Sequence, residues 1–250
     1  MLFPHNQLLS HSFTDIVMHS RPYFVDWALE HLLYCIVTDL CEHYDVIFCQ
    51  EHWPSPDFLY KIDVVSTDFA CFSKSSTKTA VTGWVLLGRP FGGISVLIRN
   101  QYASDAKLIA LEKRFIVISI NNLLLINVYL PNCDSTEEYK SNFLDKLCAV
   151  GEIIDQQQNA QVALGGYFNF VFCETNWSYR MLREFSDEYK ISPMPLSPSS
   201  PTGYSYCQKT LQHHSLIDHF CISVDMVPAV LRVSIDAGNN LSDYLPDECF

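Results

Sequence analysis

The sequence predicts an α/β (α+β) protein in which two β-sheets stack face to face and helices cover their outer surfaces. Predicted strands outnumber predicted helices, and they come in meandering runs with helices inserted singly. A regular strand–helix alternation would instead predict one open parallel sheet. Hydrophobic residues make up 48% of the 250 positions and charged residues 18%, which is enough apolar material for one large core.

The first half of the chain predicts one helix and several strands. Residues 27–44 place apolar side chains three and four positions apart, the spacing of a helix that faces a core. The short apolar runs that follow predict strands at 45–49, 69–73, 83–88, 93–100, 107–111, 114–120 and 123–130. Two asparagines at 121–122 suit a tight hairpin turn, because asparagine tolerates positive φ.

The second half predicts two helices and three strands. Thr136 is a candidate N-cap for a helix over 136–157, because two acids follow it in the first turn. A second helix is expected over 178–189, and residues 192–203 are rich in proline and serine and predict a loop. The remaining apolar runs predict strands at 161–166, 215–223 and 229–235.

Composition narrows the setting in which the protein works. Ten cysteines without a Cys-x-x-Cys pair predict buried free thiols in a reducing compartment, so we expect an intracellular protein of the cytoplasm or nucleus, not a secreted one. No apolar run reaches the ~18 residues of a membrane span, and the N-terminus does not resemble a signal peptide. A formal net charge of −12 counts against broad attraction to nucleic acid, although it leaves room for a local basic groove.

Several predicted strands end in polar residues, which are the candidates for a functional site. The polar positions at or near these strand ends are Gln50, Glu51, Asn127, Tyr129, Asn132, Tyr167, Asn169, Asp218 and Asp243. Taken singly, acids and amides at strand ends are most often turn formers or caps. Asp218 differs, because a carboxylate between Ile217 and Phe220 is expected to be buried and then needs a partner.

The order of these motifs resembles the endonuclease/exonuclease/phosphatase family. The segments in question read Gln-Glu-x-Trp, Asn-Val-Tyr-x-Pro-Asn, Gly-Gly-x-Phe-Asn, Ile-Asp-His and Ser-Asp-x-x-Pro. "GRPFGGISVLIRN" and "HSLIDHFCIS" narrow the resemblance to the apurinic-like endonuclease domains of non-LTR (LINE-type) retrotransposons. The resemblance covers roughly residues 38–246 and implies a four-layer sandwich of two mixed sheets flanked by helices. We assign the domain to 27–250, after an atypical segment at 1–26.

The resemblance implies a role for individual residues. Family members hydrolyse phosphodiesters with a divalent ion, Mg²⁺ or Mn²⁺, which prefers hard oxygen ligands. Glu51 would be the principal metal ligand, with Asp243 near the metal. Tyr129 would approach the scissile phosphate and Asn169 would orient the attacking water. The implied partner is DNA, contacted by Asn132 and Arg89, and the implied history is a fusion to a reverse transcriptase.

The sequence departs from the family pattern at three places. The family has an aspartate that activates water where this chain has Tyr167, and a histidine that neutralises phosphate charge where it has Tyr244. Asp218 would be the carboxylate that orients this histidine. The family's first strand ends in an asparagine, and no matching strand is recognisable before Glu51, so we expect the first strand to be missing.

These departures predict impaired catalysis. A general base contributes about 10²–10⁴ in rate and a preorganised charge-stabilising group about 10²–10³, so we expect activity at least ~10³ lower than in an intact relative. Two alternatives remain open: a non-catalytic module of the same fold that binds nucleic acid or protein, and a decayed retrotransposon fragment with a marginal fold. Lipid phosphodiesterases and inositol-phosphate phosphatases of the same superfamily rank lower.

Overall fold

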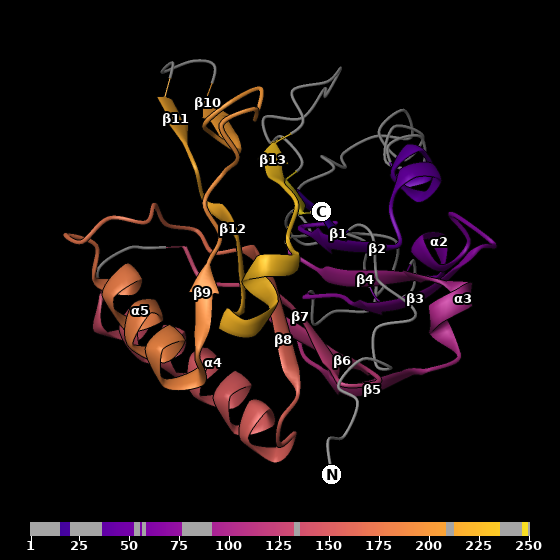
Figure 1. Cartoon of the computed structure of the whole chain (residues 1–250), viewed down its shortest axis with the longest axis horizontal. Coiled ribbons are helices and arrows are strands. Elements are labelled where there is room, and N and C mark those ends of the chain that lie inside the picture. Colours follow the sequence, from indigo (N-terminus) through magenta and orange to yellow (C-terminus); the bar gives the residue numbers. More distant parts are fainter. Residues whose placement is uncertain are drawn as a thin grey trace, which may run out of the picture.

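The fold is built from two six-stranded sheets that pack face to face (Figure 1). The computed structural model describes residues 16–20, 37–52, 56, 59–76, 92–132, 136–208, 213–235 and 247–249. The first sheet has the order β13 (Val233–Ile235), β14 (Asp247–Cys249), β1 (Ile16–Ser20), β2 (Val46–Gln50), β4 (Ile94–Arg99) and β3 (Phe69–Lys74). The second has the order β5 (Ala106–Leu111), β6 (Phe115–Ile120), β7 (Leu123–Tyr129), β8 (Gln161–Tyr167), β12 (Asp218–Ser223) and β9 (Ile191–Pro193).

Both sheets are mixed. β1 runs parallel to β2 in the first sheet, and β7 runs parallel to β8 in the second, whereas the other described pairs are antiparallel. The crossover between β7 and β8 carries the helix α4 (Glu137–Gln156), as a parallel connection requires. A separate two-stranded ribbon, β10 (Tyr206–Gln208) and β11 (His213–Ser215), stands beyond the N-terminal end of β12.

Helices cover the outer face of each sheet. Residues 37–43 are helical and, with α2 (Tyr60–Asp63), pack on the outer side of β2, β3 and β4. The outer side of β6, β7 and β8 is covered by α4 and α5 (Trp177–Tyr189), which lie next to each other in Figure 1. The predicted four-layer sandwich is therefore confirmed.

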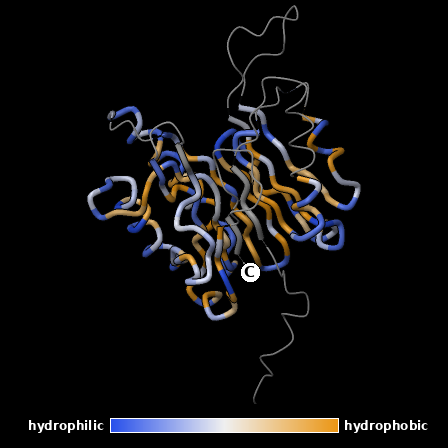
Figure 2. Tube along the Cα trace, turned by 90° about the horizontal axis from the view of Figure 1, so that it is seen from above, coloured by the Kyte–Doolittle hydropathy of each residue, from blue (hydrophilic) through white to orange (hydrophobic). Residues whose placement is uncertain are grey.

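The central core lies between the two sheets. Its most deeply buried side chains alternate along the strands, as one buried face per sheet demands. They include Val46, Phe48, Val96, Ile98, Ile116, Ile118, Leu125 and Phe220. Figure 2 shows the hydrophobic strands gathered in the interior and the hydrophilic segments at the periphery. Within the described residues, no helix has both the length and the apolar character needed to cross a membrane.

The helix α4 begins at the predicted cap, and α5 begins one residue before the predicted start. Thr136 caps α4, because its side chain accepts a hydrogen bond of 3.1 Å from the backbone N–H of Tyr139. Asn176 caps α5 in the same way, and α5 ends at Lys190 in the left-handed region, with φ of 51°. The turn between β6 and β7 lies at Asn121 and Asn122, and Asn121 has the expected positive φ of 53°.

Two expectations from the sequence are wrong. The first strand is present: β1 pairs with β2 from Ile16↔Val46 to Ser20↔Gln50, so the segment 1–26 contributes to the sheet. Pairing with β2 uses backbone groups and needs no terminal asparagine, which is why no motif marks β1. The second error concerns 192–203, because β9 includes Ser192 and Pro193; an edge strand tolerates a proline, which has no N–H to donate. The expected strand at 83–88 and helical residues 27–36 lie outside the described residues.

Gly166 allows β7 and β8 to approach each other near their ends. Its φ is +139°, and an added Cβ would lie 2.0 Å from the carbonyl oxygen of Val128. That oxygen belongs to the backbone of the neighbouring strand, so it has no rotamer by which to move away. Because Tyr167 follows directly, the conformation of Gly166 fixes the place of this ring.

We expect Gly166→Ala to lower the free energy of unfolding by at least about 3 kcal/mol, because the clash and the disfavoured φ add. Urea denaturation followed by circular dichroism measures the change. Gly203→Ala is the matched control, since nothing lies within 4 Å of the Cβ position of Gly203. Equal stability of the two variants would contradict this account.

Candidate active site

A buried amide pair joins the two sheets where β2 ends. The side-chain amide of Gln50, the last residue of β2, donates a hydrogen bond of 2.5 Å to Oδ1 of Asn127 on β7. The amide of Asn127 in turn donates to the carbonyl oxygens of Ser95, at 2.8 Å, and Cys49, at 3.3 Å. Gln50 and Asn127 are both 0% exposed. The Asn127 amide on β7 therefore forms hydrogen bonds with both β2 and β4 of the opposite sheet.

Glu51 and Tyr129 form a second link beside the first. The hydroxyl of Tyr129, the last residue of β7, donates a hydrogen bond of 2.7 Å to Oε1 of Glu51. Burial, followed by the negative charge of Glu51, raises the pKa of Tyr129 far above its ordinary value, so the phenol keeps its proton. Glu51 is 6% exposed, which is unusual for a carboxylate.

The backbone of Glu51 is held in an uncommon conformation. Its φ is 56°, in the left-handed region that costs a non-glycine residue roughly 1–2 kcal/mol. The N–H of Glu51 bonds to the carbonyl oxygen of Gly93 at 2.8 Å. A Cβ on Gly93 would lie 2.5 Å from the His52 ring, so the glycine leaves room for this turn. Strain that is retained at an acid among buried aromatic rings suggests a functional site.

Tyr129, Tyr167 and Asp218 form one row across the second sheet. Tyr129 on β7 lies opposite Tyr167 on β8, and Tyr167 lies opposite Asp218 on β12. The two tyrosine rings stack with centroids 5.7 Å apart and an angle of 11° between their planes. Both rings belong to the core cluster between the sheets and are less than a tenth exposed. The two rings of this row therefore lie on the face of the second sheet that faces Glu51.

Asp218 is buried as the sequence predicts, with 1% of its surface exposed. The hydroxyl of the buried Ser205 accepts hydrogen bonds from the backbone N–H groups of Ile217, at 3.1 Å, and Asp218, at 3.2 Å. This serine fixes the entry of the chain into β12. Nothing in the sequence marks Ser205, because a serine in a serine-rich loop gives no distinguishing signal.

The other predicted site residues differ in burial, and some lie outside the described part of the chain. Asn169 is half-buried with φ of 64°, and its amide donates a hydrogen bond of 2.7 Å to the carbonyl oxygen of Leu130. It thereby links the ends of β7 and β8. Asn132 is exposed two residues beyond Leu130. Asp243, Tyr244 and Arg89 lie outside the described residues, so their roles stay predictions.

Arg114 is a further member of the site, and no motif in the sequence marks it. Its guanidinium carbon lies 4.3 Å from the centre of the Tyr129 ring. Nη1 of Arg114 lies 3.5 Å from the carbonyl oxygen of Tyr129. The backbone N–H of Tyr129 donates a hydrogen bond of 2.8 Å to the carbonyl oxygen of Arg114. A basic residue just before β6 gives no sign in the sequence that it will contact the end of β7.

The oxygen-rich surroundings of Glu51 fit a hard divalent ion. Mg²⁺ is commonly bound by one or two carboxylates while it keeps several waters. Glu51 supplies a carboxylate, and Oε1 of the neighbouring Gln50 is buried without a hydrogen-bond donor in the described part of the chain. Asp243 is the second acid that the resemblance assigns. A group of three possible metal ligands lies elsewhere in the described part of the chain. It consists of Asp39, Glu42 and His43, which are exposed on the helix at 37–43.

Comparison with solved structures reveals the fold. A 3′ phosphatase, NExo from Neisseria bound to product DNA hairpin, matches with a TM-score of 0.69 and 16% identity, over 94% of this chain and 98% of that chain. A 3′-5′ exonuclease (NExo) from Neisseria meningitidis matches with a TM-score of 0.66 and 16% identity, over 94% and 98%. The AP endonuclease LMAP from Leishmania major matches with a TM-score of 0.71 and 10% identity, over 94% and 86%.

The chain has the endonuclease/exonuclease/phosphatase fold. No protein-family model and no curated protein matches the sequence. At identities of 10–16% the structural matches establish the fold and leave the chemistry to be argued from the residues at the site.

Two histidines next to the site are buried and neutral. Burial lowers the pKa of His219 to about 3 and the pKa of His52 to about 4. His219 stacks on Phe172 with centroids 3.4 Å apart and meets Phe168 edge-on. The imidazole therefore behaves as part of an aromatic cluster with Phe168 and Phe172.

We expect stability to fall when the pH falls below about 6.5. An unfolded histidine takes up a proton near pH 6.5, whereas His219 in the folded chain resists it until pH is about 3. The stabilisation from each buried neutral histidine is therefore complete above pH 6.5. By pH 5, the contribution of each of the two histidines to the free energy of unfolding falls by about 2 kcal/mol. Urea denaturation at pH 7.5 and pH 5 measures the loss.

His219→Gln should remove about 2 kcal/mol of this difference between the two pH values. His213→Gln is the control, because His213 is exposed on β11. An unchanged pH dependence in His219→Gln would show that His219 is not the group responsible.

Proposed function

We propose that this chain is a metal-dependent phosphodiesterase domain of the endonuclease type, descended from a LINE-type retrotransposon and impaired in catalysis by Tyr167 and Tyr244. The observation that carries the proposal is the place of Tyr167. It lies at the end of β8, stacked on Tyr129, whose hydroxyl bonds to Glu51. The Tyr167 side chain therefore contacts Tyr129, which in turn contacts Glu51, the acid assigned to the metal.

Tyr167 is a poor replacement for a carboxylate base. A free phenol has a pKa near 10, so it keeps its proton at neutral pH and is a poor general base. Its ring is 4% exposed and occupies space within the core cluster. With Tyr244 in place of the family's histidine, the cationic helper is also lost. The combined effect supports a rate at least ~10³ below that of an intact relative.

Glu51, with Asp243, would hold Mg²⁺ or Mn²⁺. Such an ion supplies charge stabilisation to a phosphoryl oxygen and an acidic bound water. The chain's own residues have simpler tasks. The Tyr129 hydroxyl orients the carboxylate of Glu51, and the Asn169 side chain holds the ends of β7 and β8 together. Buried rings around the site exclude water and lower the local dielectric constant.

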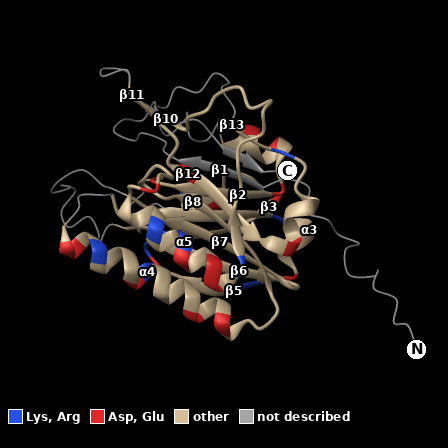
Figure 3. Cartoon of the chain, turned by 60° about the vertical axis from the view of Figure 1, so that its left-hand side comes forward, with Lys and Arg blue, Asp and Glu red and all other residues tan. Residues whose placement is uncertain are grey.

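Nucleic acid is the proposed substrate. One structural neighbour is bound to a product DNA hairpin, and another is an AP endonuclease, which supports this class of ligand. The net charge of −12 weakens the attraction, and Figure 3 shows Asp and Glu positions along α4 and α5, interspersed with Lys and Arg. Binding would therefore depend on local cations such as Arg114 and on low salt.

A non-catalytic binding module is the second candidate. The stacked pair of Tyr129 and Tyr167 favours it, because a filled site has less room for a reacting phosphate. The decayed-fragment hypothesis loses one support, because β1 and β14 complete the first sheet. The buried free thiols of Cys41, Cys49 and Cys221 agree with the proposed intracellular location.

A nicking assay on supercoiled plasmid with Mg²⁺ or Mn²⁺ tests the proposal. We expect the natural chain to be near background, and the Tyr167→Asp, Tyr244→His double variant to gain at least about 100-fold, because the base and the cation return. Glu51→Gln in the double variant should abolish the gain.

Strong nicking by the natural chain that disappears in Glu51→Gln would show that the tyrosines do not impair catalysis. Salt-dependent DNA binding without nicking in either form would favour the binding module. Cys173→Ser serves as the control, since Cys173 is exposed.

A further inference from the structure

We propose that Arg114 is a positioning residue that holds the Tyr129 ring so that its hydroxyl points at Glu51. Its relevance to catalysis depends on the proposed function. The positioning itself depends only on the contacts described below. These contacts are with Tyr129, so Arg114 acts through that ring and is assigned no direct catalytic part.

Three contacts fix Arg114 relative to Tyr129. The guanidinium lies over the ring at 4.3 Å, within the range of a cation–π interaction. Nη1 lies 3.5 Å from the carbonyl oxygen of Tyr129, and the two backbones are joined by a 2.8 Å hydrogen bond. The planar guanidinium thus lies against both the ring and the backbone of one residue.

The ring has a second restraint from Tyr167. The nearly parallel stack at 5.7 Å limits rotation of the Tyr129 ring away from its present plane. With the ring restrained by Arg114 and Tyr167, the hydroxyl has one direction in which to donate. That direction leads to Oε1 of Glu51, 2.7 Å away.

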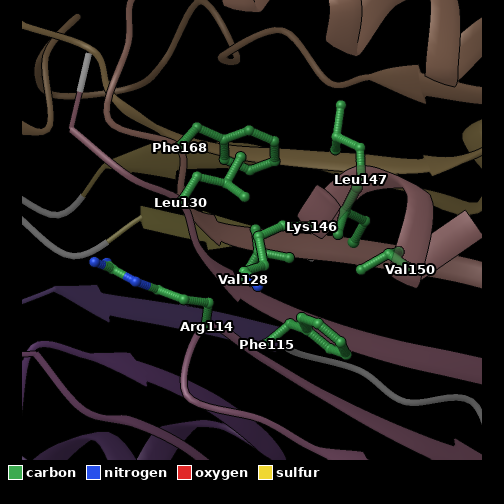
Figure 4. Close-up of a pocket in the computed structure, with 9 residues that line it drawn as sticks. Arg114, Phe115, Val128, Leu130, Lys146, Leu147, Val150 and Phe168 are labelled. Atoms are coloured by element: carbon green, nitrogen blue, oxygen red, sulfur yellow. The ribbon is translucent and has the colours of Figure 1, made fainter. Parts of the chain in front are cut away.

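A simpler role for Arg114 would be to fill space. It lines an apolar cavity between α4 and the outer face of β6, β7 and β8, together with Phe115, Val128, Lys146, Leu147 and Phe168 among others. Figure 4 shows the Arg114 side chain extending away from the apolar side chains of this cavity. The guanidinium carbon lies 4.3 Å from the centre of the Tyr129 ring instead. Lys146 borders the same cavity from α4, whereas the ring contacts of Tyr129 described above come from Arg114 and Tyr167, so Lys146 offers a matched control.

A double-mutant cycle on the metal-free chain tests the proposal. Tyr129→Phe removes the hydroxyl but keeps the ring, and we expect it to lower the folding equilibrium constant about tenfold in the natural chain, as loss of a hydrogen bond to a carboxylate does. In the Arg114→Gln background the same change should cost less than about threefold, because the hydroxyl is no longer directed at Glu51. In the Lys146→Gln background the cost should stay about tenfold.

Arg114→Lys separates positioning from simple attraction between charges. Lysine keeps the positive charge but lacks the planar group that stacks on a ring. If Arg114 positions the ring, Tyr129→Phe should lower the folding equilibrium constant in the Arg114→Lys background by less than in the natural chain and by more than in the Arg114→Gln background. Coupling that is fully retained in Arg114→Lys, or an equal cost of Tyr129→Phe in all backgrounds, would overturn the proposal.

Terbium luminescence adds a spectroscopic readout that packing alone does not change. Tb³⁺ is a hard cation that binds carboxylates, and its emission under tyrosine excitation depends steeply on the distance to a ring. The emission that is lost in Glu51→Gln defines the site. We expect this part to fall at least about threefold in Arg114→Gln and to be unchanged in Lys146→Gln. Unchanged emission in Arg114→Gln would count against positioning. If the natural chain shows no emission that depends on Glu51, the proposed metal site fails, and the double-mutant cycle alone decides the role of Arg114.

Discussion

The hydrogen bond between Gln50 and Asn127 is the constraint on which the site depends. Both side chains are fully buried in the space between the sheets, where an amide without a partner costs roughly 1–3 kcal/mol. Asn127 also binds the carbonyl oxygens of Ser95 and Cys49, so one amide organises two strands of the opposite sheet. Apolar packing alone would let the sheets slide, whereas these directional bonds specify one relative position.

That relative position puts Glu51 opposite Tyr129. Glu51 follows Gln50, and Tyr129 lies two residues beyond Asn127 on the same face of β7. The row through Tyr167 to Asp218 then brings the ends of β7, β8 and β12 to the same place. Gly166 allows the close approach on which this row depends. The side chain at the centre of this row, at the end of β8, is the phenol of Tyr167.

Much of the architecture was predictable because it depends on local pattern. The strands at 93–100, 114–120 and 123–130 and the helix at 136–157 are long, periodic and bounded by turn or cap residues such as Asn121 and Thr136. β1 was not predicted, because a five-residue strand gains its stability from its neighbour β2 and not from its own sequence. Arg114 could not be recognised as part of the site for a related reason. The sequence shows its charge but not the ring that it will cover.

The sequence by itself determined the class of fold, the order of the polar strand ends and the presence of tyrosines at positions 167 and 244. These features follow from residue identity and spacing along one chain. Only the tertiary structure decided that Tyr129 donates to Glu51, that Tyr167 stacks on Tyr129 and that Arg114 covers the same ring. Each of these contacts joins strands that are distant in sequence or belong to different sheets. Their geometry depends on how the sheets pack and on strand register, and one sequence does not encode either in a local pattern.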